Sequence, residues 1–126
     1  MRLLGLAILF VVAVASNAQT QKTDPCKGDT TYEMRQCAAR RYKQADDELN
    51  RVYRNLISKL DNEGHQTSLK TAQQAWLKYR DSHCEFESYL NRGGTIYPVV
   101  LTECVTSVTT ARTKELKEEI YRLEHL

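Results

Sequence analysis

The chain contains few of the residues that interrupt helices. Its 126 residues include only five glycines and two prolines. After the apolar start, these residues gather at three places, namely residues 25–28, Gly64 and residues 93–98. Because glycine and proline punctuate local structure, so few of them argue against many short strands and favour long helices.

The chain also lacks a cluster of charge of one sign. Eighteen Lys and Arg residues accompany sixteen Asp and Glu residues, and no basic run is longer than two residues. Proteins that bind nucleic acid or acidic membrane surfaces need clustered cations. We therefore expect no nucleic-acid binding and no polybasic membrane contact.

One long apolar run is present, and it lies at the start of the sequence. Arg2 precedes an apolar run from Leu3 to Ala15, and Ser16-Asn17-Ala18 fits a small-x-small cleavage site. This is the layout of a secretory signal peptide, and the run is shorter than the roughly 20 residues that span a bilayer. We expect residues 1–18 to be removed on export, with no stable membrane insertion. No cysteine follows the expected cut, so no lipid anchor is expected at that point.

The expected mature chain is a single domain in the periplasm or outside the cell. Removing 18 of 126 residues leaves 108, and the loss of Arg2 leaves 17 cations against 16 acids, a net charge of +1. A chain of this length forms one domain with a modest core. The polar residues 19–29 are read as an irregular arm, and residues 30–126 as the helical domain.

Regular apolar spacing predicts three helices, over about residues 31–60, 66–90 and 98–124. Thr30 and Glu33 form a capping box at the start of the first helix. Steps of three and four residues between apolar positions mark a heptad-like stripe on each helix. The stripes comprise Ala38, Tyr42, Ala45, Leu49, Val52 and Leu56; then Leu69, Ala72, Trp76, Tyr79, His83, Phe86 and Leu90; then Leu101, Val105, Val108, Leu116, Ile120 and Leu123. Amphipathic helices with short connections predict an all-α, antiparallel three-helix bundle.

The four cysteines, Cys26, Cys37, Cys84 and Cys104, favour two disulfides. An even number of cysteines behind an export signal is typical of disulfide bonding. The alternative, a zinc site, is weak because no C-x-x-C or H-x-x-x-H pair is present. Cys84 and Cys104 lie equally far from the Gly-Gly turn, so they should be level across the second and third helices. Cys26 can reach back to Cys37, which gives the favoured pairs Cys26–Cys37 and Cys84–Cys104.

The sequence predicts neither a catalytic site nor a cofactor or metal site. His83 lies on the second stripe, but Asp81 is two residues away and points elsewhere on a helix. A neutral core histidine is the favoured interpretation. The acids at 46–48 are read as a solvated or ion-paired face, because no nucleophile, base and oxyanion set can be assembled. We therefore expect a protein that is not an enzyme.

Arg112 interrupts the apolar stripe of the third helix. An arginine on such a seam must pair with an acid or extend its head to solvent. We expect an ion pair between helices, with Asp46, Asp47 or Glu48 as its partner, and Arg80 as a further member of this polar network.

The turn of Gly93, Gly94, Thr95, Ile96 and Tyr97 is the candidate partner-binding site. An apolar and aromatic tip on a glycine hinge, tied by a nearby disulfide, suits insertion into a groove of a partner. The alternative is that Ile96 and Tyr97 only cap the end of the bundle.

The order and spacing of these features resemble the family of small exported bacterial proteins named after the lysozyme inhibitor LprI. The matching pieces are Cys26 with Thr31-x-x-Met34-x-x-Cys37-Ala38; Ala45-Asp46-Asp47-Glu48-Leu49-Asn50 with Tyr53; Leu69-Lys70-x-Ala72-Gln73-x-Ala75-Trp76-x-x-Tyr79-Arg80-Asp81-x-x-Cys84; Gly93-Gly94 and Cys104; and Thr110-x-Arg112-x-x-Glu115-Leu116. The resemblance covers about residues 26–116.

The resemblance implies an exported, disulfide-bonded helical domain that inhibits a lysozyme or another cell-wall hydrolase by direct binding. Because the mature chain is nearly neutral, either the contact with a basic lysozyme is mainly apolar or lysozyme is not the target. The alternative function is a structural or adaptor module of the bacterial cell envelope without effect on lysozyme.

Overall fold

The computed structural model describes residues 24–126, which are all-α apart from turns. The elements, in chain order, are η1 (Pro25–Lys27), α1 (Thr31–Ser58), α2 (Glu63–Glu87), η2 (Tyr89–Asn91) and α3 (Tyr97–Glu124). The expected signal peptide over residues 1–18 lies outside the described residues. Within residues 24–126, no helix combines the length and apolar character needed to cross a membrane.

The three predicted helices are confirmed, with shifted ends. The capping box forms as expected, since the Glu33 amide donates to the Thr30 hydroxyl and Glu33 accepts from the Thr30 amide. The second helix begins at Glu63, three residues earlier than predicted. The reason is Asn62, whose side chain accepts a hydrogen bond from the His65 amide at 3.0 Å and so caps the helix.

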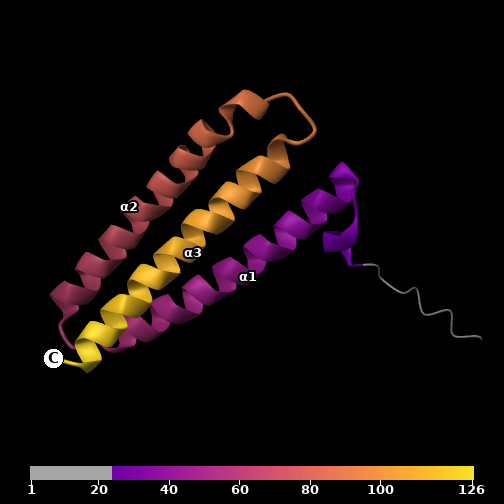
Figure 1. Ribbon diagram of the computed structural model, residues 1–126. Coiled ribbons are helices and arrows are strands. Elements are labelled where there is room, and N and C mark those ends of the chain that lie inside the picture. The colour runs from indigo at the N-terminus through magenta and orange to yellow at the C-terminus, as the bar shows by residue number, and fades with distance from the viewer. Residues whose placement is uncertain (1–23) are drawn as a thin grey trace, which may run out of the picture.

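Helix α3 lies between the other two helices (Figure 1). It runs parallel to α1 and antiparallel to α2, because each short connection reverses the chain once. Helices α1 and α2 meet at their connection near residues 59–62 and diverge towards the other end of the molecule (Figure 1). The arrangement is therefore a splayed bundle in which α3 packs on both neighbours.

The apolar core lies between α1 and the C-terminal half of α3. Its buried members are Leu49, Val52, Leu56, Leu60, Leu116 and Ile120. The partly buried residues Tyr53, Leu69, Trp76 and Leu123 pack against it. Leu49, Val52 and Leu56 belong to the predicted stripe of the first helix, so that stripe is confirmed as core.

The second predicted stripe is only half buried, and this corrects the sequence analysis. Leu69 and Trp76 pack on the core, but Tyr79, Phe86 and Leu90 are 58%, 75% and 95% exposed. The reason is the divergence of α1 from α2, which leaves this end of the stripe uncovered. The buried residues of this segment lie on a different face, with Arg80, Cys84 and the C-cap Ser88 at steps of four, and Cys84 on this face is joined to α3 by the disulfide with Cys104.

The threonine-rich first half of α3 forms a regular helix despite its β-prone composition. The hydroxyls of Thr106, Thr110 and Thr113 donate to the backbone carbonyls four residues earlier. Such bonds satisfy the hydroxyls within the helix. Thr113 is therefore buried with its hydroxyl satisfied, whereas Thr109 is fully buried and its hydroxyl has no hydrogen-bond partner within residues 24–126.

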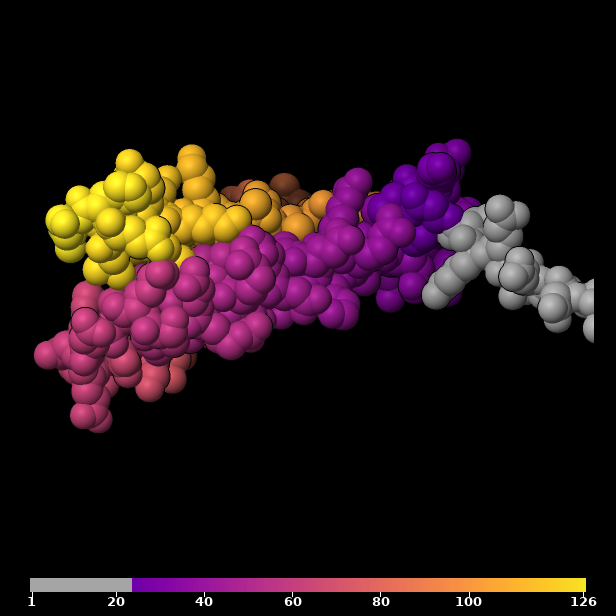
Figure 2. Space-filling model, turned by 90° about the horizontal axis from the view of Figure 1, so that it is seen from below, coloured from indigo at the N-terminus to yellow at the C-terminus, as the bar shows by residue number. Residues whose placement is uncertain are grey.

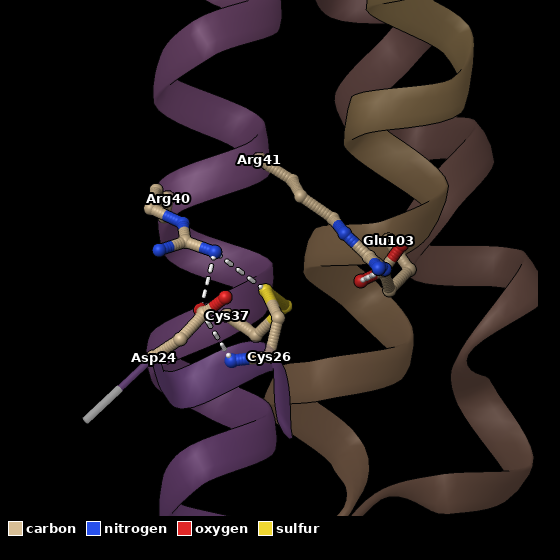
Figure 3. The surroundings of a disulfide bond; sticks show 6 residues. All are labelled: Asp24, Cys26, Cys37, Arg40, Arg41 and Glu103. Atoms are coloured by element: carbon tan, nitrogen blue, oxygen red, sulfur yellow. Dashed lines mark hydrogen bonds and ion pairs between the residues drawn. A yellow bond between two sulfur atoms is a disulfide. The ribbon is translucent and has the colours of Figure 1, made fainter. Parts of the chain in front are cut away.

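The first disulfide, Cys26–Cys37, ties η1 to the start of α1 (Figure 3). Arg40 Nη2 donates to Asp24 Oδ1 at 2.7 Å and lies 3.0 Å from Cys26 Sγ. The Cys26 amide donates to the same Asp24 oxygen at 3.0 Å. The part of the arm from Asp24 onwards is thus folded onto α1, and it includes a short 3₁₀ helix.

Glu48 links α1 to α3 by a pair of charged contacts. It accepts hydrogen bonds from Arg51 on its own helix and lies 2.8 Å from Lys117 Nζ on α3. The hydrogen bonds from Arg51 and then Lys117 lower the pKa of Glu48 from 4.5 to about 2. Because the folded pKa is depressed, the contribution of Glu48 to stability is present above about pH 4.5 and is lost as the pH falls through about 2.

We predict that Glu48→Gln reduces the acid sensitivity of the fold. The difference in free energy of unfolding between wild type and this variant should shrink as the pH is lowered from about 4.5 to about 2. Denaturant titrations followed by circular dichroism at several pH values measure it. Glu118→Gln, at an exposed position of α3, is the control; an equal pH dependence in wild type and Glu48→Gln would contradict the prediction.

Candidate partner-binding surface

The Gly-Gly turn joins η2 to α3 at the end of the molecule opposite the C-terminus (Figure 1). Gly93 has a φ of +80°, a conformation that side chains strongly disfavour. The Gly94 amide donates to the Asn91 carbonyl at 3.1 Å, and the Tyr97 amide donates to the Gly94 carbonyl at 3.3 Å. The turn is therefore held by its own backbone.

The second disulfide, Cys84–Cys104, closes the base of this turn. The two Cα atoms lie 5.6 Å apart, and the bond spans 20 residues of sequence. Cys84 is fully buried, and the Ser88 hydroxyl beside it donates to the Cys84 carbonyl at 2.6 Å. Both disulfides thus join the pairs that were favoured from the sequence.

An arginine clamps the α2 side of the turn. Arg92 Nη2 lies 2.5 Å from Glu85 Oε2, and its guanidinium lies over the ring of Tyr89 at 5.0 Å. A cation above an aromatic face is attracted by the ring quadrupole. This contact orders Tyr89, which the sequence analysis did not select, and adds it to the candidate site.

We call this region the turn surface, and define it as Tyr89, Gly93, Gly94, Thr95, Ile96 and Tyr97. Tyr89 is 60% exposed and Ile96 is 37% exposed, whereas Tyr97 is half-buried. The five residues selected from the sequence are thus contiguous here, with Tyr97 as an anchor and Ile96 as a partly exposed tip. The 3₁₀ helix after Ser88 brings Tyr89 to the site, and the sequence pattern gave no signal for it.

The predicted polar network around Arg112 does not form, and this is a correction. Arg112 Nε donates to Gln73 Oε1 at 3.1 Å, and Nη1 donates to Glu115 Oε2 at 2.9 Å. Glu115 lies one turn further along the same helix, so it is nearer than any acid on α1. The expected partners bond elsewhere: Asp46 with Asn50, Asp47 with Lys43, and Glu48 with Arg51 and Lys117.

Arg80 is the most deeply buried charged side chain among the described residues, with 9% of it exposed. Its guanidinium lies 5.3 Å from the Trp76 ring centroid and 5.9 Å from that of Tyr42, so it fills the space between α1 and α2. Nε donates to Asp81 at 2.9 Å, but the buried Nη1 has no hydrogen-bond partner within residues 24–126. Arg80 is thus held mainly by aromatic packing and is not joined to Arg112 by an acid.

We predict that Arg80→Met leaves the free energy of unfolding within about 1 kcal/mol of wild type, or raises it. Methionine keeps the packing between the rings and removes the desolvation cost of the unpaired Nη1. Asp81 is exposed, so no charge is left buried. Arg80→Ala is the matched contrast and should cost about 2–3 kcal/mol through lost packing. Chemical denaturation of the three proteins measures this, and a loss above about 3 kcal/mol in Arg80→Met would show that the charge itself stabilises the fold.

A groove of about 460 Å³ lies at the opposite end of the molecule from the turn surface. Leucines form much of its lining, and the rest comes from His65, Ser68 and Ala72 of α2 and from charged residues of α3. Two of its arginines are already paired along α3, Arg112 with Glu115 and Arg122 with Glu119. Within residues 24–126, no group of three or more His, Cys, Asp or Glu side chains is placed to hold a metal ion.

The fold and this surface define a class: a small, all-helical domain with two disulfides and a constrained turn at one end. The chain belongs to the lysozyme inhibitor LprI family, whose model matches residues 23–116. The resemblance stated from the sequence is thereby confirmed, and the match begins within the arm, before Thr30.

The chain is also similar to two other bacterial proteins. The chain is 34% identical to an uncharacterized protein of Rhizobium meliloti (strain 1021), over 90% of this chain and 91% of that one. It is also similar to the crystal structure of a DUF1311 family protein from Pseudomonas putida KT2440, with a TM-score of 0.66 and 24% identity. That likeness covers 72% of this chain and 92% of the Pseudomonas protein, and it supports the fold.

Proposed function

We propose that this chain is an exported, non-enzymatic protein that inhibits a lysozyme or another cell-wall hydrolase by binding to it directly. Membership of the LprI family is the observation that carries this proposal. The two disulfides suit an oxidising compartment such as the periplasm or the exterior of the cell.

We further propose the turn surface as the part that contacts the hydrolase. It combines an exposed aromatic ring with an aliphatic tip, and such residues supply much of the binding energy at protein interfaces. The Cys84–Cys104 bond and the Arg92–Glu85 pair restrict the turn before binding. A surface that is already ordered loses less conformational freedom when the complex forms.

The charges near the turn predict how this contact depends on salt. Arg92 is neutralised by Glu85, and the chain as a whole carries a formal net charge of only +2. Long-range attraction to a basic hydrolase is therefore weak, and apolar contacts must dominate. Inhibition should accordingly change little when the ionic strength is raised.

The test is an activity titration with the mature, oxidised protein. Lysozyme is assayed on purified cell walls with increasing protein, and inhibition is expected by about 10–50 µM. Ile96→Asp should weaken inhibition at least about tenfold by placing a charge at the tip. Tyr121→Asp is the control, because Tyr121 is also an exposed apolar side chain but lies near the C-terminal end of α3.

Three outcomes are informative. Inhibition that is lost in Ile96→Asp and kept in Tyr121→Asp supports both parts of the proposal. Inhibition unaffected by Ile96→Asp contradicts the turn surface as the contact. No inhibition of lysozyme or of periplasmic wall hydrolases would contradict the inhibitor function and favour the adaptor module, for which co-purification with an envelope protein is the positive result.

A further inference from the structure

The Cys26–Cys37 disulfide has a positive charge beside one of its sulfur atoms. Arg40 Nη2 donates a hydrogen bond to Cys26 Sγ at 3.0 Å, and Figure 3 shows the guanidinium turned toward the disulfide. Among the side-chain hydrogen bonds of the described residues, none reaches a sulfur of Cys84 or Cys104. A neighbouring arginine stabilises a cysteine thiolate and is a common feature of reactive cysteines. The cation therefore distinguishes the first disulfide from the second.

Cys26 is the sulfur of this pair that a reagent reaches from solvent. It is half-buried, whereas Cys37 is only 7% exposed. Cys26 lies in the single 3₁₀ turn η1, and Cys37 lies in the second turn of α1. Cys104 is also half-buried, so exposure alone does not separate the two disulfides. The guanidinium beside Cys26 is the feature that does.

We propose that thiols open the Cys26–Cys37 disulfide by attack at Cys26, and that Cys84–Cys104 is a permanent cross-link. In the first step a reagent thiolate bonds to Cys26 Sγ, the bond to Cys37 breaks, and the electron pair leaves on the Cys37 sulfur, which takes a proton from water. In the second step another thiolate attacks the reagent sulfur of this mixed disulfide, and the electron pair leaves on Cys26. Arg40 stabilises the thiolate that is released. Two thiols, or one dithiol protein, are thus oxidised to a disulfide as the two cysteines are reduced.

Opening this disulfide should leave the three helices folded. The capping box of Thr30 and Glu33 sets the start of α1, and the apolar core lies further along α1 and in the C-terminal half of α3. The disulfide spans 11 residues against 20 for the second one, so it restricts the unfolded chain less. The expected product is a folded domain that carries two thiols and in which η1 is released from α1.

Asp24 partly neutralises the cation beside the disulfide. Its Oδ1 accepts a hydrogen bond from Arg40 Nη2 at 2.7 Å and another from the Cys26 amide at 3.0 Å. The bond from the Cys26 amide and then that from Arg40 lower the pKa of Asp24, so its carboxylate is charged at neutral pH. Arg40→Met and Asp24→Asn consequently weaken the same contact between the arm and α1, but the first removes the cation and the second frees it.

A thiol-exchange time course of the mature, oxidised protein tests the proposal, with reduced glutathione as the reagent. Samples are quenched with a maleimide and digested, and the peptides are identified by mass spectrometry. The Cys26–Cys37 bond should open at least about tenfold faster than Cys84–Cys104, with glutathione attached to Cys26 and maleimide to Cys37. Circular dichroism should show unchanged helix content, and oxidised glutathione should restore the bond.

Two variants test the role of the cation. Asp24→Asn should open faster than wild type and Arg40→Met more slowly, and the two rates should differ by at least about threefold. Arg54→Met is the matched control for the loss of one cation, because Arg54 is an exposed arginine of the same helix, about 21 Å further along it. Its rate should equal that of wild type.

Opening of both disulfides at the same rate, or glutathione on Cys37 alone, overturns the proposal. Faster opening in both Asp24→Asn and Arg40→Met would show that a loosened arm controls the exchange, and overturns the role given to Arg40. Loss of helix on opening overturns the expected folded product. No wall hydrolase is present in these assays, so a failure here is separate from a failure of the proposed function.

Discussion

Replacing Cys84 and Cys104 together by alanine is expected to lower the free energy of unfolding by about 3 kcal/mol and to impair inhibition. The disulfide closes a segment of 20 residues, and opening it enlarges the conformational freedom of the unfolded chain. It also frees the base of the turn surface, so Ile96 and Tyr89 would be presented in more conformations. Binding then has to order them, which weakens affinity.

The matched comparison is the double replacement of Cys26 and Cys37 by alanine. This disulfide spans 11 residues and ties η1 to α1, so its loss should also reduce stability. It does not close the turn, and inhibition should therefore remain near wild type. Both variants are compared by denaturant titration and by lysozyme assay at a temperature where both stay folded. Equal inhibition by the Cys84/Cys104 variant and wild type would show that a rigid turn is not required.

The second large effect is expected for Leu49→Ala in the core. Leu49 is almost fully buried between α1 and α3, and truncating such a leucine costs about 2–5 kcal/mol through lost burial and the cavity left behind. Leu90→Ala is the matched control, because Leu90 is a leucine on a predicted heptad stripe that is almost fully exposed. Leu90→Ala should change the free energy of unfolding by less than about 0.5 kcal/mol.

Unfolding midpoints in urea measure both variants. If the two substitutions proved equally costly, Leu90 in η2 would have to be packed against other residues in solution. If neither substitution lowered the unfolding midpoint, the assignment of the core to the space between α1 and α3 would be wrong.

This pair of leucines also shows what the sequence can predict. Heptad spacing correctly groups residues on one face of a helix, and in α1 that face is the core. Spacing does not say whether another helix covers the face along its whole length. For α2 the coverage of the stripe depends on the angle between α1 and α2, which is a property of the whole fold. The predicted burial of the second stripe therefore failed from Tyr79 onwards.

The candidate site, too, was predicted from the sequence only in part. Gly93 and Gly94 marked the turn because few other residues adopt a positive φ, and the structure places Gly93 in that conformation. Tyr89 was missed because a 3₁₀ helix changes the direction of its side chain. The predicted partner of Arg112 was wrong because several acids were compatible with the sequence. Only the packed structure shows that Gln73 and Glu115 lie within hydrogen-bond reach of Arg112.

The direction of α3, which leads from the turn surface to the C-terminus, has a practical consequence for measuring binding. The C-terminus and the arm lie at opposite ends of the molecule (Figure 2), and α3 carries the chain from the turn surface to the C-terminus. A helix of 28 residues is about 42 Å long. Immobilising the protein on a sensor chip through a C-terminal tag would therefore hold the turn surface about 40 Å above the attachment point, free for a large hydrolase to approach.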